Sequence, residues 1–174
     1  MSEAGASIET LIEAAGWAQV DDASALAARA YAATVGAAPA AAGGVALLLT
    51  DDEKMRALNN DFRNKDRPTN VLSFPSGAPA PGFIGDIALG LETCLREAAE
   101  TGTGLADHAT HLIVHGLLHL IGYDHQTDED AEEMEAMEID ILAGLGIENP
   151  YMTRNAKPGA SPDAIDARPP GDGA

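Results

Sequence analysis

The sequence predicts a single α+β domain in which about four strands are flanked by helices. Four short apolar runs, typical of strands, lie at residues 8–13, 45–49, 71–74 and 83–89. Longer segments with apolar residues every three to four positions, typical of amphipathic helices, alternate with these runs and follow them. A chain of 174 residues suits one hydrophobic core of ordinary size. We therefore expect one domain, formed by residues 1–150.

The first part of the chain is expected to form a strand, a helix and a second strand. Ile8–Glu13 alternates weakly between apolar and polar residues, as a half-buried strand does. Asp22–Val35 is expected to be a helix, because aspartate at its start can accept hydrogen bonds from unpaired backbone N–H groups of the first turn. After a loop at Pro39–Gly44, the apolar run Val45–Leu49 fits a strand buried on both faces.

A second helix is expected to start at Thr50–Asp52. Its apolar residues Met55, Leu58 and Phe62 are spaced for one helix face, so we expect all three to point into the core. Pro68 then marks the loop that leads to the next strand.

The remainder of the domain is expected to contain a hairpin and three helices. The turn sequence SGAPAPG joins the runs at 71–74 and 83–89, which favours a hairpin-like connection. Helices are expected at 92–100, 105–121 and 127–145. Half of the prolines lie in the last twenty-five residues, so 151–174 is expected to be a tail, disordered from Lys157 onward.

The stretch from His115 to His125, HGLLHLIGYDH, has the spacing of a three-histidine metal site. On a helix, His115 and His119 lie one turn apart on the same face, so both can bind one ion. Gly122 can adopt the left-handed conformation that ends a helix and turns the chain back, which brings His125 to the same ion. Three neutral nitrogens leave one position of a tetrahedral zinc open, as in catalytic sites. We therefore expect one Zn²⁺ per chain.

The same stretch matches the metzincin motif H-E-x-x-H-x-x-G-x-x-H at every defined position except one. Gly116 stands where those proteases carry the glutamate that acts as general base. A metal could still activate a water here, but the usual base for peptide hydrolysis is missing. His108 and His111, just upstream, are interpreted as ordinary core or surface residues.

The charge of the chain opposes long-range attraction to nucleic acid but leaves a local basic strip. The formal net charge is −18, which repels phosphate groups. Five of the ten basic residues nevertheless lie within fourteen positions: Lys54, Arg56, Arg63, Lys65 and Arg67. An arginine in the strip can clamp a phosphate, but its local sequence favours an arginine that simply ends a helix. The strip as a whole can hold an RNA or form a solvated loop. The charge pattern alone leaves both readings open.

The composition also bears on the location of the protein. The chain has no apolar stretch of eighteen or more residues, and its start lacks the basic and apolar regions of a signal peptide. Cys94 is the only cysteine, which excludes an intramolecular disulfide and suits a reducing compartment. We expect a cytoplasmic protein without a membrane partner.

Three blocks of the sequence resemble the signature of the YbeY family, bacterial endoribonucleases of ribosomal RNA maturation. They are LNNDFRNKDRPTNVLSFP, GDIALG and HLIVHGLLHLIGYDH. The resemblance extends in order from Ile8 to Gly146. It implies a small mixed β-sheet flanked by helices, with the metal site at a cleft.

This resemblance also implies a function and assigns residues to it. His115, His119 and His125 match the family's zinc ligands, and Arg63 matches the arginine that the family needs for activity. The implied function is that of a metal-dependent endoribonuclease, specific for single-stranded ribosomal RNA. It would act in ribosomal RNA maturation and ribosome quality control, with the small ribosomal subunit as partner. The expected catalytic residues are Arg63 and His115, and the expected substrate-binding residues are Arg63, Lys65 and Arg67.

Several alternatives stay open at this point. The group that takes the proton could be a metal-bound hydroxide or the 2′-hydroxyl of the RNA. Asp124 could instead orient a histidine. The motif spacing also allows a zinc peptidase-like hydrolase, or a ribosome-binding module that zinc stabilises without catalysis. Three imidazoles suit nickel or copper as well as zinc.

Overall fold

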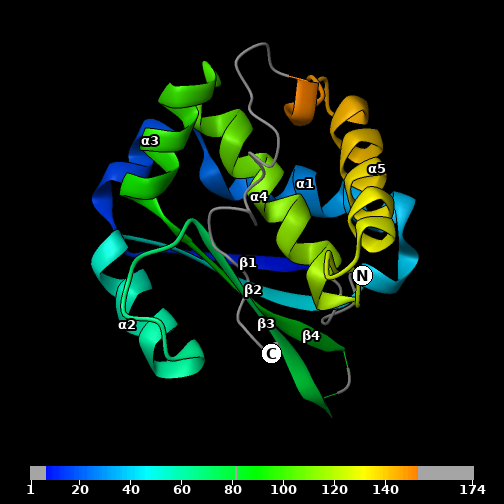
Figure 1. The fold of residues 1–174 in the computed structure, drawn as a ribbon, viewed down its shortest axis with the longest axis horizontal. Coiled ribbons are helices and arrows are strands. Elements are labelled where there is room, and N and C mark those ends of the chain that lie inside the picture. Colours follow the sequence, from blue (N-terminus) through cyan, green and yellow to red (C-terminus); the bar gives the residue numbers. More distant parts are fainter. Residues whose placement is uncertain (1–6, 81, 153–174) are drawn as a thin grey trace.

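Four strands form one mixed sheet in the order β1-β2-β4-β3 (Figure 1). The computed structural model describes residues 7–80 and 82–152. The strands are β1 (Ile8–Ile12), β2 (Gly44–Thr50), β3 (Val71–Ala80) and β4 (Phe83–Gly90). β2 pairs in parallel with β1 and β4, while β3 and β4 form the predicted antiparallel hairpin. The predicted α+β class and the mixed sheet are confirmed.

The helices follow the local signals in the sequence. They are α1 (Ala23–Ala37), α2 (Asp52–Arg63), α3 (Leu91–Thr101), α4 (Leu105–Leu120) and α5 (Asp128–Gly144). Side chains cap three of them, because Asp22, Asp51 and Thr127 each accept a hydrogen bond from a first-turn backbone N–H. None of the helices in the described part of the chain is long and apolar enough to cross a membrane.

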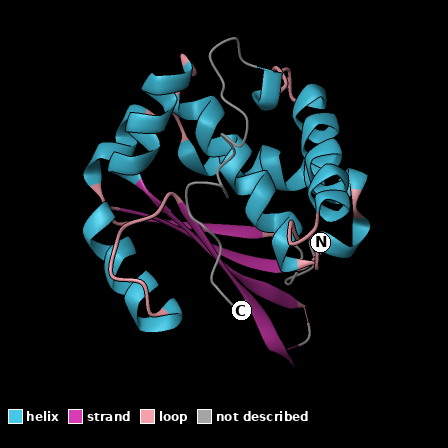
Figure 2. Ribbon diagram, in the orientation of Figure 1, coloured by secondary structure: helices cyan, strands magenta, loops and turns pink. Residues whose placement is uncertain are grey.

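The helices lie on both sides of the sheet. α1 and α4 cover one face and α5 packs on these two helices, while α2 covers the other face; Figure 2 shows the strands between these layers. Residues of β2 alternate accordingly: Leu47 and Leu49 enter the large core, whereas Leu48 packs into a small cluster with Met55 and Leu72. The predicted burial on both faces is therefore right for the face of Leu47 and Leu49, whereas Ala46 and Leu48 on the other face are only partly buried.

The predicted core face of α2 is right for Met55 and Leu58 but wrong for Phe62. Met55 is fully buried and Leu58 packs beside it, whereas 66% of Phe62 is exposed. The ring of Phe62 contacts the ring of Phe74, with the ring centroids 5.2 Å apart. Phe74 lies on β3, which is an edge strand, so no further strand covers the outer side of Phe62.

Little of the predicted tail falls within the described residues. Tyr151 belongs to a short 3-10 helix, Pro150–Met152, that follows α5. Residues 153–174 lie outside the described part of the chain, so the disordered tail stays a prediction.

α4 lies close against β4 at Gly116. A Cβ atom at this position would be 3.0–3.2 Å from three side-chain atoms of Ile87, which is tighter than ordinary van der Waals contact. Position 116 therefore faces the sheet. The residue that is a glutamate in metzincins must here be small, because the packing of α4 on the sheet leaves no room for a side chain.

We predict that Gly116→Glu lowers the free energy of unfolding by about 1–3 kcal/mol or more, because the side chain overpacks Ile87 and buries a carboxylate. Urea unfolding followed by circular dichroism measures the change. Gly36→Glu is the matched control, since a Cβ at this exposed position of α1 meets nothing within 4 Å. Equal stability of the two variants would show that the contact with Ile87 does not constrain position 116.

Candidate metal centre

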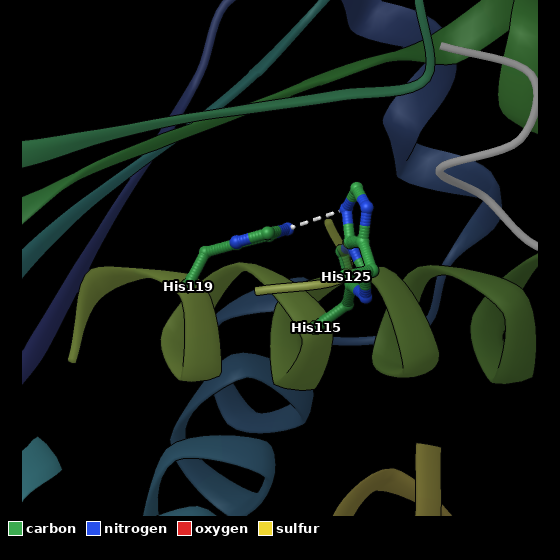
Figure 3. Close-up of side chains that lie close together, drawn as sticks. All are labelled: His115, His119 and His125. Atoms are coloured by element: carbon green, nitrogen blue, oxygen red, sulfur yellow. Dashed lines mark hydrogen bonds between the residues drawn. The ribbon is translucent and has the colours of Figure 1, made fainter. Parts of the chain in front are cut away.

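Three histidine side chains from α4 and the turn after it lie together (Figure 3). Each offers one ring nitrogen, and the three nitrogens lie within 4.8 Å of one another. His115 is buried, whereas His119 and His125 are half-buried. The structure thus brings together the three residues that the spacing predicts, in a group that could hold a metal ion. Their assignment as metal ligands stays a prediction.

The turn that carries His125 has the predicted conformation. Gly122 has a φ of +106°, in the region that favours glycine. The backbone N–H of Gly122 donates to the carbonyl oxygen of His119, and that of Tyr123 donates to the carbonyl oxygen of Leu118. These bonds close the C-terminal end of α4 and direct the chain back toward its last turn.

The donor set fits a zinc ion. Two nitrogens bound to one tetrahedral zinc at about 2.0–2.1 Å would lie roughly 3.3 Å apart. The Nε2 atoms of His119 and His125 are 3.2 Å apart. Three imidazoles are also ligands of the borderline-soft type that zinc prefers.

The carboxylate that orients a histidine ring is Glu138, on α5. Its Oε2 lies 2.5 Å from Nδ1 of His115. Because Nδ1 is engaged by this carboxylate, Nε2 is the His115 nitrogen that a metal would bind. Asp124, which the sequence suggested for this task, instead accepts a hydrogen bond from the backbone N–H of His125. Asp124 therefore stabilises the turn.

Glu138 is fully buried and is held by three side chains. Its Oε1 lies 2.9 Å from Nε2 of His111 and accepts a hydrogen bond from the hydroxyl of Tyr151. Burial acts to raise the pKa of the Glu138 carboxyl, but the charge of His115 and the hydrogen bonds of His111 and His115 outweigh it and hold the pKa well below its ordinary value. Glu138 is therefore an ionised carboxylate between two histidines.

Sequence reasoning missed Glu138, although a signal was present. On α5, Met134, Glu138, Ile141 and Leu142 are the buried residues, at spacings of four, seven and eight. A glutamate inside an otherwise apolar stripe indicates a buried partner. The interpretation of His108 as an ordinary residue agrees with its position 2.8 Å from Glu97, whereas His111 bonds Glu138 and so contributes to the surroundings of His115.

Arg63 lies at the end of α2 and reaches the edge of the sheet. Its Nη2 donates to the backbone carbonyl oxygen of Ser73 on β3, at 3.3 Å. Lys65 and Arg67 lie in the loop that follows, and Asn59 fixes this loop by donating to the carbonyl oxygen of Arg67. The predicted substrate-binding residues therefore share one ordered segment beside β3.

The basic segment and the end of α4 both contact the β3–β4 hairpin. A Cβ atom at Gly85 of β4 would be 2.6 Å from both the Leu120 side chain and the backbone oxygen of Phe74. Leu120 directly follows His119 in the chain, and Phe74 directly follows the residue bonded by Arg63. Arg63 thus bonds β3, while the residue that follows His119 packs against the neighbouring strand β4.

Comparison with known proteins identifies the family. The family model described as Endoribonuclease YbeY matches residues 16–146. The chain belongs to the YbeY family. Endoribonuclease YbeY of Rhodopseudomonas palustris is 49% identical over 151 residues, covering 82% of this chain and 80% of the relative. That of Dinoroseobacter shibae is 47% identical over 169 residues, covering 86% and 93%.

A solved structure supports the fold. The solution structure of TM1509 from Thermotoga maritima matches with a TM-score of 0.53 and 23% sequence identity, covering 88% of this chain and 99% of that protein. The YbeY match at residues 16–146 includes the three histidines, the basic segment and Glu138, while β1 and Tyr151 lie outside it.

We predict that Glu138→Gln weakens metal binding by roughly 10- to 100-fold, because the neutral amide no longer supports the His115 ring. Competition with a chromophoric chelator measures the dissociation constant. Glu132→Gln, an exposed substitution on the same helix, is the control and should leave the constant unchanged. Unaltered metal affinity in the Glu138→Gln protein would mean that this carboxylate serves only the packing of α5.

Proposed function

We propose that this chain is a metal-dependent endoribonuclease that cleaves single-stranded ribosomal RNA in the cytoplasm. The observation that carries the proposal is the convergence of three imidazoles in a chain of the YbeY family, whose relatives are named endoribonucleases. The proposal includes a role in ribosomal RNA maturation and ribosome quality control, with the small ribosomal subunit as partner.

His115, His119 and His125 would hold one zinc ion. When bound, zinc supplies a Lewis acid for a phosphoryl oxygen or for a water. Glu138 keeps the His115 ring in the orientation that directs Nε2 away from α5. His119 and His125, which are half-buried, are the members of the group that solvent and substrate can reach.

Arg63 is the proposed partner of the scissile phosphate. A guanidinium has five N–H donors in a planar fork, and the bond to Ser73 uses one of them. The others can pair with two phosphate oxygens and neutralise the negative charge that grows in the transition state. Lys65 and Arg67, in the same ordered segment, would hold the adjacent RNA backbone.

The peptidase alternative is disfavoured by the packing of α4. Position 116, which would carry the general base, faces Ile87 of the sheet. The buried carboxylate of the site, Glu138, is engaged by His115 and His111. A ribosome-binding module without catalysis is the other alternative, and it is separated from an enzyme by the cleavage assays below.

We predict that Arg63→Glu reduces RNA cleavage by at least about 100-fold while the metal content stays at that of the unchanged protein. Cleavage of a labelled single-stranded ribosomal RNA fragment and elemental analysis measure the two properties. Arg96→Glu, which places the same charge change on the exposed face of α3, controls for net charge. Normal cleavage by the Arg63→Glu protein would remove Arg63 from the chemistry.

We predict that His119→Ala removes most of the bound metal and, with it, cleavage, because two of the three imidazoles cannot complete the site. His108→Ala is the matched control, since His108 bonds Glu97 outside the group. Elemental analysis measures the zinc content, and cleavage is assayed with and without chelator. Metal-loaded protein that binds the RNA but never cuts it would favour the binding module.

A further inference from the structure

We infer that Phe62, supported by Phe74, forms a stacking platform for one nucleobase of a single-stranded RNA substrate. This inference rests on the proposed function and extends it to a residue outside the histidine group and the basic strip. The aromatic pair defined by these two residues lies on the side of the sheet covered by α2.

Phe62 presents a large apolar side chain to solvent. In the described part of the chain the exposed large apolar residues are Leu11, Ile12, Phe62 and Phe83, and Phe62 is the most exposed of them at 66%. Its ring meets Phe74 at an interplanar angle of 60°, so one part of the ring is supported and the remainder faces outward. An aromatic ring held in this way presents a flat apolar surface at low cost in side-chain entropy.

Three cations lie close to Phe62 in the sequence. Arg63 follows Phe62 directly, and Lys65 and Arg67 lie in the loop that begins one residue later. Single-stranded nucleic acid is bound where a base stacks on an aromatic ring while nearby cations hold the backbone. Although the chain has a net charge of −18, an aromatic ring and three cations occur together within residues 62–67.

The segment is held in place before any ligand binds. Asn64 adopts a left-handed conformation that ends α2, and the backbone N–H of Lys65 donates to the carbonyl oxygen of Asn59. Arg56 pairs with Asp66 through two hydrogen bonds, at 2.6 and 3.1 Å. Because the loop is ordered by these contacts, binding would not have to supply the free energy of ordering it.

The orientation of a bound nucleotide follows from the neighbouring charges. Asp86 lies opposite Phe74 in the strand register, on the inner strand β4, whereas Arg63 bonds Ser73 on the edge strand β3. A carboxylate there repels phosphate, whereas Arg63 attracts it. The base would therefore cover the ring of Phe62, and its phosphate would lie toward Arg63, which bonds the edge strand β3.

The test is the affinity of the full-length protein for a short fluorescent single-stranded RNA, measured by anisotropy in chelator so that the RNA stays intact. Phe62→Ala and Phe62→Leu are expected to weaken binding by roughly 5- to 150-fold, because each removes an aromatic face, while Phe62→Trp retains the affinity. Leu11→Ala is the matched control, since it removes a similarly exposed apolar side chain from β1, the opposite edge of the sheet.

A second arm examines the base itself. It uses a set of RNAs, each with one nucleotide that lacks its base. We expect one of these RNAs to bind the unchanged protein and the Phe62→Ala protein with equal affinity, because the stacked base is then absent from both complexes. Circular dichroism checks that the variants fold. If the Phe62→Ala protein does not fold, the RNA affinities of the Phe62→Leu and Phe62→Trp proteins are compared instead. Full affinity of the Phe62→Leu protein would overturn the stacking platform.

The outcomes separate this inference from the proposed function. If the unchanged protein neither binds nor cuts single-stranded RNA, both fail. If it cuts the RNA and Phe62→Ala raises KM no more than Leu11→Ala does, the platform alone fails and the exposed ring serves another contact, such as a protein partner. A raised KM with little change in kcat supports the platform, since Phe62 binds a nucleotide without acting on the scissile bond.

Discussion

The close packing of α4 on the sheet is the constraint on which the rest of the structure depends. Every residue from Ala109 to Leu118 is buried, and the helix contacts the sheet and its neighbouring helices. Gly116 permits the approach to Ile87. With the helix fixed in this way, His115 lies inside the protein and His119 lies one turn later at the boundary with solvent. The position of the histidine group is therefore set by the packing of the core.

A buried ionic network connects that core to the site. A carboxylate in the protein interior is costly unless charges and hydrogen bonds compensate for lost hydration. Glu138 obtains this compensation from His111 and His115 on α4 and from Tyr151 beyond α5. Three separate segments must be in place before the network is complete. It therefore couples the docking of α5 to the orientation of a histidine in the site.

The features that sequence analysis predicted are those with local causes. Helix caps, the hairpin, the apolar runs and the turn at Gly122 depend on neighbouring residues, and so does the meeting of three histidines. Phe62 was wrongly expected to point into the core, and Glu138 was not recognised as part of the site. In both cases the surroundings of the residue come from other elements. The exposure of Phe62 follows from the position of β3 at the sheet edge, and the burial of Glu138 follows from histidines on another helix. Periodicity gives the face of a helix, but not which part of that face another element covers.

The bond between Arg63 and Ser73 has a consequence for assembly. A strand at the edge of a sheet offers backbone groups that can pair with a strand of another molecule and start aggregation, and natural proteins place charged side chains there to prevent it. The guanidinium of Arg63 donates a hydrogen bond to a backbone carbonyl oxygen on one edge of the sheet. The other edge, β1, exposes Leu11 and Ile12. The edge beside the basic segment is therefore protected against strand addition by a charged side chain, whereas the β1 edge carries apolar ones.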